Sequence, residues 1–67
     1  MNSYISTVVQ ALEQNSIVMV HRSMLSVDDA KLIEDMAFKL NKTIFFATLK
    51  DIMDTMNKKD KSIFIVQ

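Results

Sequence analysis

Residues 43–49, with the sequence TIFFATL, place the tightest constraint on the fold of this chain. The segment is rich in β-branched and aromatic residues and is apolar at almost every position, which predicts a β-strand covered on both faces. Residues 17–20 and 63–66 are two more short apolar runs and predict two further strands. Helical patterns lie between the runs, so we expect helices and strands to alternate around the segment at 43–49.

Three amphipathic helices are predicted around these strands. The first is expected over about residues 3–14, where Tyr4 and Leu12 fall on one apolar face. Ser26 and Thr48 each precede an aspartate by three positions, a spacing close to that of a capping box at the start of a helix. The second and third helices are therefore expected to begin directly after these two residues.

The chain contains neither Gly nor Pro, although average usage would give about five of the first and about three of the second. The lack of Gly excludes every phosphate-binding loop that is built on Gly. It also requires another residue wherever the backbone adopts the left-handed conformation. Asn tolerates that conformation better than most residues, so we expect Asn15, Asn41 and Asn57 to end the three helices.

The alternation of helix and strand in the order α-β-α-β-α-β predicts a single small α/β domain over residues 1–67, with three helices and a three-stranded, mostly parallel sheet. Two strand orders stay open. Order 1-2-3 places the second and third helices on one face of the sheet, and order 2-1-3 places them on opposite faces. All three strands are apolar on both faces, and three helices are few to cover them. We therefore expect homodimerisation to complete the fold by burying a face of the sheet, a face of a helix or the edge of the last strand, which is open to pairing.

The size of the chain also favours self-association. A chain of 67 residues buries only about 60% of the surface that its unfolded form exposes, and small domains usually need an additional source of stability. The chain has no Cys and one His, which excludes a disulfide and makes a structural zinc site unexpected. We expect no metal and no other cofactor, so the remaining sources of stability are the rich apolar fraction, 49%, and oligomerisation.

Charge and hydropathy limit the classes of partner. Eight acidic residues balance eight basic ones, and no basic stripe is present beyond the cluster at Lys58, Lys59 and Lys61, so nucleic-acid binding is not expected. No apolar run approaches the roughly 20 residues of a membrane span. The N-terminal residues lack the basic and apolar regions of a signal peptide, so we expect a cytoplasmic protein.

Polar residues at the ends of two predicted strands form a candidate ligand site. His21, Arg22 and Ser23 follow the first strand, Ser26 begins the next helix, and Lys50 follows the second strand. Ligands of parallel sheets bind at the carboxyl ends of the strands, and a helix N-terminus attracts anions. A small-ligand or nucleotide-binding module that uses this loop is therefore one hypothesis. The simpler interpretation, which we favour, makes Ser26 only a helix cap, Arg22 a solvated side chain and His21 a strand end.

The sequence offers no convincing catalytic group. A triad of His21, Ser23 and Asp28 or Asp29 satisfies the residue types, but nothing fixes its geometry and the chain has no Gly-rich nucleophile turn. Adjacent acidic residues on a helix diverge by about 100°, so Asp28 and Asp29 do not form an acid–base or metal-binding pair. We therefore expect no enzyme activity.

Six methionines are many for a chain of this length, and methionine fills irregular gaps in cores. Four of them occupy core positions of the predicted helices and strands: Met19, Met36, Met53 and Met56. Met24 and Leu25 lie in a predicted loop, and Phe64 and Val66 lie in the last strand, so these four residues are the candidates for a protein interface.

Together these features predict a small, non-enzymatic protein-interaction module that is homo-oligomeric and acts as a regulator or inhibitor by docking on a partner protein. Accessory proteins of viruses and phages often have this character. If the chain belongs to that class, its expected location is the cytoplasm of the host.

Overall fold

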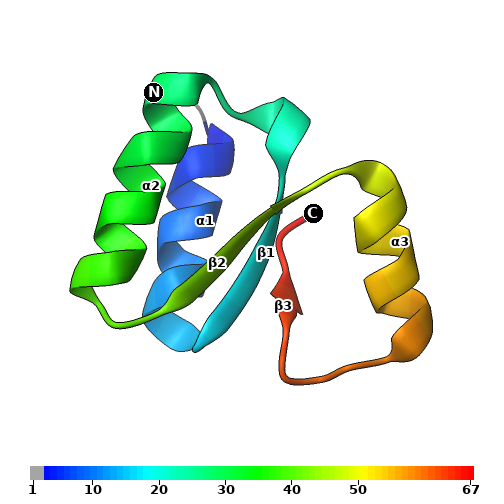
Figure 1. Ribbon diagram of the computed structural model, residues 1–67. Coiled ribbons are helices and arrows are strands. Elements are labelled where there is room, and N and C mark those ends of the chain that lie inside the picture. The colour runs from blue at the N-terminus through cyan, green and yellow to red at the C-terminus, as the bar shows by residue number, and fades with distance from the viewer. Residues whose placement is uncertain (1–2) are drawn as a thin grey trace.

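The structure is a computed structural model that describes residues 3–67, and it shows an α/β fold with three helices and a three-stranded parallel sheet (Figure 1). The predicted fold class and order of elements are confirmed. The elements are α1 (Ser3–Gln14), β1 (Ile17–His21), a short 3-10 helix η1 (Arg22–Met24), α2 (Val27–Lys39), β2 (Thr43–Ala47), α3 (Leu49–Lys58) and β3 (Phe64–Ile65).

The strands lie in the order β2-β1-β3, and β1 pairs in parallel with both neighbours. Ile17 lies opposite Thr43, and Val18 lies opposite Phe64. The order 2-1-3 is therefore the correct alternative. The segment at 43–49 is not the central strand: β2 is an edge strand, and Thr43 and Phe45 are exposed. Apolar residues on both faces of a strand indicate that both faces tend to be buried. They do not indicate whether the strand lies in the middle of the sheet or at its edge.

Two helices cover one face of the sheet and one helix covers the other. Helices α1 and α2 lie together on the first face, and α3 stands alone on the second (Figure 1). The core on the α1–α2 face contains Tyr4, Val8, Ala11, Leu12, Val18, Val20, Ile33, Ala37 and Val66. Among residues 3–67, the core on the α3 face contains only Met19, Ala47 and Ile52, with Ile63 and Ile65 partly buried against it.

This asymmetry explains where the prediction for the methionines was wrong. Met19 is buried and Met36 is half-buried, but Met53 and Met56 are exposed. Ile52 is the only buried residue of α3, because no other helix of the described part of the chain lies beside α3 to cover the rest of its apolar side. The α3 face therefore presents an apolar flank formed by Leu49, Met53 and Met56.

The predicted helix starts are confirmed. The Ser26 hydroxyl accepts a hydrogen bond from the Asp29 N–H at 3.1 Å. At α3 the Thr48 hydroxyl accepts from the Asp51 N–H at 3.3 Å, and the Asp51 carboxylate accepts from the Thr48 N–H at 3.5 Å, which completes a capping box.

The predicted helix ends are only partly confirmed. Asn41 has φ of 58°, as expected for a left-handed residue that stands in for Gly. Asn15 does not adopt this conformation, and its side-chain amide instead donates to the Ala11 carbonyl at 3.0 Å. Asn57 lies inside α3, and Lys59 is the left-handed residue, with φ of 54°.

The Asp60 side chain stabilises the connection from α3 to β3. The Asp60 carboxylate accepts hydrogen bonds from the Ser62 hydroxyl at 2.6 Å and from the Ser62 N–H at 2.9 Å. These two bonds, the hydroxyl first, hold the pKa of Asp60 below its ordinary value. After this turn β3 pairs over Phe64–Ile65 alone, so it is shorter than the apolar run at 63–66.

The left-handed conformation of Lys59 gives a direct prediction. Lys59→Gly removes the contact of the Cβ atom with the backbone and should raise the free energy of unfolding by about 0.5–1 kcal/mol, measured by urea denaturation. Lys58→Gly is the matched control, because Lys58 is the last residue of α3 and Gly there should lower stability by about 0.5 kcal/mol. A decrease for both variants would contradict the assignment of strain to Lys59.

Candidate functional site

The carboxyl ends of the strands are the first place to look for a ligand site. In open sheets with the order 2-1-3, ligands bind in the crevice between the ends of the first and third strands. In this protein those ends are His21 of β1 and Val66, directly after β3. The candidate site that the sequence predicts begins at this position.

The hydroxyl of Tyr4, from α1, occupies this crevice. It accepts a hydrogen bond from the His21 N–H at 2.8 Å and donates one to the Val66 carbonyl at 2.9 Å. The Val66 N–H donates to the Met19 carbonyl at 2.9 Å, so a regular parallel ladder would next join the His21 N–H directly to the Val66 carbonyl. The Tyr4 hydroxyl replaces that backbone bond with two hydrogen bonds, one to His21 and one to Val66. The Tyr4 side chain therefore fills the crevice where a ligand would otherwise bind.

The surroundings of Tyr4 also fix the role of His21. Burial raises the pKa of the Tyr4 hydroxyl, and the hydrogen bond from the His21 backbone opposes that rise. The two rings meet edge to face, with centroids 6.5 Å apart and planes at 68°. The half-buried His21 therefore contributes to the packing at the end of β1.

The other residues of the predicted ligand site do not converge on one point. Arg22 and Ser23 line a cavity of about 480 Å³ together with Thr48 and Leu49. Arg22 and Ser26 together line a different groove, and the Ser26 hydroxyl already caps α2. Lys50 lies in the exposed first turn of α3, outside both cavities.

Two further findings concern ligand chemistry. The first turns of α2 and α3 carry Asp28, Asp29 and Asp51, whose charges oppose an anion at either helix N-terminus. Within residues 3–67, no three His, Cys, Asp or Glu side chains gather as a metal site would require. In the same part of the chain, no helix has the length and apolar character needed to cross a membrane.

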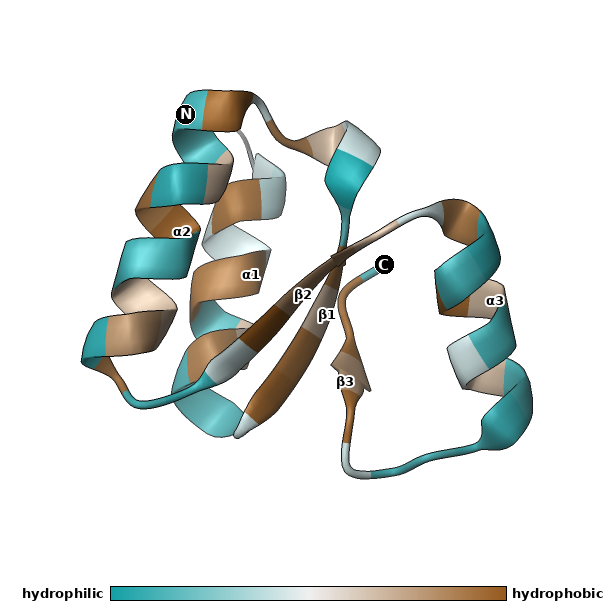
Figure 2. Ribbon diagram, in the orientation of Figure 1, coloured by the Kyte–Doolittle hydropathy of each residue, from teal (hydrophilic) through white to brown (hydrophobic). Residues whose placement is uncertain are grey.

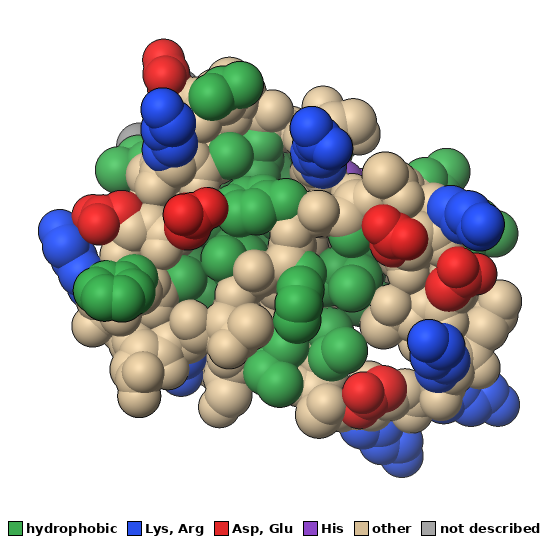
Figure 3. All heavy atoms as spheres, in the orientation of Figure 1, with side chains coloured by type: hydrophobic (Ala, Val, Ile, Leu, Met, Phe, Trp, Pro, Cys, Tyr) green, Lys and Arg blue, Asp and Glu red, His purple; other side chains and the backbone are tan. Residues whose placement is uncertain are grey.

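The strongest surface feature lies at the free edge of β2, seen face-on in Figure 3. Hydrophobic side chains gather along the middle of this view, and charged side chains lie on both sides. Apolar residues also cover most of the length of β2 (Figure 2). We define the β2 face as the free edge of β2 with the adjacent flank of α2, formed by Val27, Ala30, Lys31, Glu34, Phe38, Ile44, Phe45 and Phe46.

A groove of about 290 Å³ runs between α2 and β2 on this face. Leu25, Val27, Ala30 and Phe46 form apolar parts of its lining, and Arg22, Ser26, Lys31 and Glu34 add polar groups. Phe38, at the end of the same helix flank, is 84% exposed, and Phe45 in the middle of β2 is 46% exposed. An apolar centre with a charged rim is the usual composition of a protein interface.

The candidate interface residues predicted from the sequence fall in three environments. Met24 and Phe64 are exposed, and the half-buried Leu25 lines the groove beside β2. Val66 is only 1% exposed, because its side chain packs into the core on the α1–α2 face, so it offers no surface to a partner while the fold is closed.

Sequence reasoning missed Val27, Phe38 and Phe45. The sequence does contain a sign of exposure for Val27 and Phe38. Both are apolar residues of α2 that lie outside its stripe of core residues, on a flank that faces away from the core. No such signal existed for Phe45, because its exposure follows from the position of β2 at the edge of the sheet.

Searches against protein-family models, curated proteins and solved structures found no match to this chain.

Proposed function

We propose that this protein is a small, non-enzymatic interaction module that associates with itself and acts, as a regulator or inhibitor, by docking on a partner protein. The observation that carries the proposal is the amount of apolar surface left uncovered by one chain. Ten large hydrophobic side chains among residues 3–67 are exposed: Met24, Val27, Leu32, Phe38, Leu40, Phe45, Leu49, Met53, Met56 and Phe64. Several of them gather in two places, on the β2 face and on the flank of α3 formed by Leu49, Met53 and Met56, and exposed apolar patches mark sites of association.

Two features of the surface support the two parts of the proposal. The net charge is zero, so two copies of the chain do not repel each other through their overall charge. The apolar flank of α3 contains Met53 and Met56, and flexible methionine side chains adapt to differently shaped partners. The first feature favours self-association and the second favours docking on another protein.

Self-association is tested by absolute mass from light scattering over a wide dilution series, with the unfolding midpoint measured at each concentration. We expect a mass of at least twice the chain mass of 7.7 kDa at high concentration, which falls on dilution. The unfolding midpoint should rise with concentration, because association stabilises only the folded chain. A mass of 7.7 kDa and a constant midpoint throughout would reject the proposal.

A further inference from the structure

We propose that two copies of this chain join through the β2 face, with the two β2 strands antiparallel, to form one continuous six-stranded sheet. This inference rests on the proposed self-association and specifies its geometry. The occupant of the β2 face is then a second copy of the chain, related by a two-fold axis perpendicular to the sheet, and the same surface of both copies is used.

The two edge strands, β2 and β3, differ in how well they are protected against pairing with another strand. Natural edge strands are protected by short length, by charged residues or by Pro and bulges. The β3 edge, which was expected from the sequence to be open to pairing, is protected in this way, since β3 has two residues and follows a turn that contains Lys59 and Lys61. The β2 strand has five residues, none of them charged and none of them Pro. Its sequence is that of a central strand, and pairing with a second copy would place it at the centre.

The backbone hydrogen bonds between β1 and β2 show which residues of β2 face the open edge of the sheet. The Thr43 N–H donates to the Ser16 carbonyl at 2.9 Å, so Thr43 faces β1. The backbone groups of alternate residues in a strand point to the same side, so the N–H and C=O groups of Phe45 and Ala47 also point toward β1. The N–H and C=O groups of Ile44 and Phe46 point the other way, from the open edge of the sheet. The antiparallel register that overlaps all five residues sets Ile44 opposite Phe46 of the second copy and forms four new hydrogen bonds.

The same register places Phe45 on the two-fold axis. Phe45 is then opposite Phe45 of the second copy in a non-hydrogen-bonded pair, where side chains approach most closely and aromatic pairs are favourable. This contact would cover the exposed part of the Phe45 ring on the α3 face.

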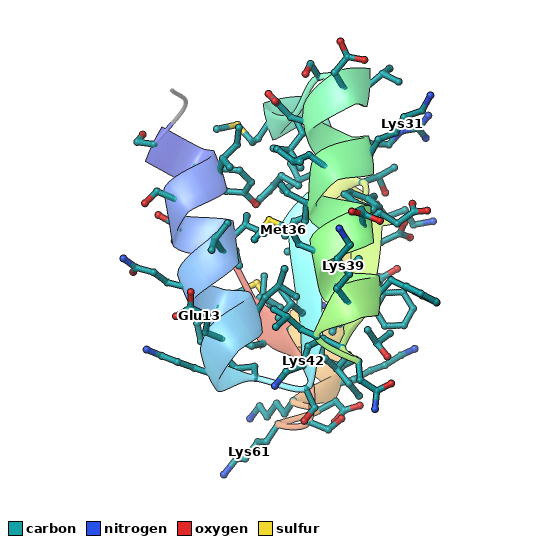
Figure 4. The ribbon with its side chains drawn as sticks, turned by 90° about the vertical axis from the view of Figure 1, so that its left-hand side faces the viewer. Glu13, Lys31, Met36, Lys39, Lys42 and Lys61 are labelled. Atoms are coloured by element: carbon teal, nitrogen blue, oxygen red, sulfur yellow. The ribbon has the colours of Figure 1, made fainter. Side chains whose placement is uncertain are left out.

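The charged residues along α2 also favour an antiparallel pair of chains. Val27, Lys31, Glu34 and Phe38 lie along the flank of α2 that borders β2. Figure 4 shows Lys31 on the side of α2 away from α1, whereas Met36 points between the two helices. Two antiparallel copies of α2 that meet midway between Leu32 and Ile33 would set Lys31 opposite Glu34 and Val27 opposite Phe38, because the members of each pair are equally far from that point. The flank is therefore complementary to itself.

The decisive experiment compares Phe45→Lys with Phe64→Lys by sedimentation of the full chain. The two phenylalanines are 46% and 45% exposed and lie on opposite edge strands, so Phe64→Lys is a matched control. Phe45→Lys places two ammonium groups opposite each other and should weaken dimerisation by roughly a hundredfold or more, whereas Phe64→Lys should leave it within about threefold. Circular dichroism of both variants verifies that the fold is kept.

A charge exchange provides a second, independent test that leaves β2 unchanged. Lys31→Glu and Glu34→Lys should each weaken dimerisation by about tenfold at low salt, because two attractive pairs become repulsive. The double variant should recover the dimer, and an equimolar mixture of the two single variants should form a heterodimer.

The outcomes separate this inference from the proposed function. A dimer that Phe45→Lys leaves intact, or single charge variants that do not combine on mixing, would overturn the β2 geometry while self-association stands. A wild-type chain of 7.7 kDa at every concentration would overturn both.

Discussion

Ile33→Ala is expected to lower the free energy of unfolding by about 2–5 kcal/mol. Ile33 is fully buried, with 0% of its surface exposed, in the core between α1, α2 and β1. Removing three carbon atoms there leaves a cavity that the surrounding helices fill only in part. Domains of this size have total stabilities near the lower end of about 5–15 kcal/mol, so this single substitution should remove a large fraction of the stability.

Leu32→Ala is the matched control for this prediction. Leu32 is the preceding residue of the same helix, but it is 56% exposed, and alanine favours the helix as well as leucine does. Its free energy of unfolding should change by no more than about 0.5 kcal/mol. Urea denaturation of both variants measures the difference between their free energies of unfolding. One protein concentration is used for both, because association would make the apparent stability depend on concentration. Equal losses for the two variants would show that the core is not centred on Ile33.

The contrast between Ile33 and Leu32 illustrates which features of this fold follow from local sequence. The apolar period of α1 predicts its bounds at Ser3–Gln14, and the Ser26 and Thr48 caps predict where α2 and α3 begin. These features depend on residues within one turn of each other, so no knowledge of the rest of the chain is needed.

Features that depend on distant neighbours were not predictable in the same way. Nothing within residues 43–47 shows that β2 has β1 on one side and none of the strands described in residues 3–67 on the other. Met53 and Met56 have the helical spacing of core residues, but their burial would require a second helix beside α3. In both cases the local pattern reports a tendency toward burial, and the number of covering elements decides whether burial occurs within one chain.

The Tyr4 bridge is the clearest case of a feature that local sequence cannot reveal. Tyr4 was correctly expected on the apolar face of α1, but its hydroxyl partners, His21 and Val66, are 17 and 62 positions away. Only the order β2-β1-β3 brings the end of β1 and the end of the chain together beneath the first turn of α1. The same contact closes the crevice in which a ligand of such a sheet would bind, so it bears on function as well as on stability.

Tyr4→Phe is expected to lower the free energy of unfolding by about 1–3 kcal/mol. The ring stays in the core, but the His21 N–H and the Val66 carbonyl lose their partner, and unpaired groups in a buried position are costly. Thr55→Val is the control, because it removes a hydroxyl whose bond to the Asp51 carbonyl, at 2.8 Å, is exposed to solvent. That variant should change stability by about 0.5 kcal/mol or less.

The pH dependence of the same variant tests the environment of the hydroxyl. Burial raises the pKa of Tyr4 above its ordinary value of 10.0, so the folded chain holds this proton more tightly than the unfolded chain does. The stability that results is complete below pH 10 and is lost as the pH rises through the folded-state pKa. Tyr4→Phe should lack this part of the alkaline loss. If the wild type and the variant had the same stability at pH 7 and the same decline above pH 10, the bridge between α1, β1 and the end of the chain would contribute nothing to the fold.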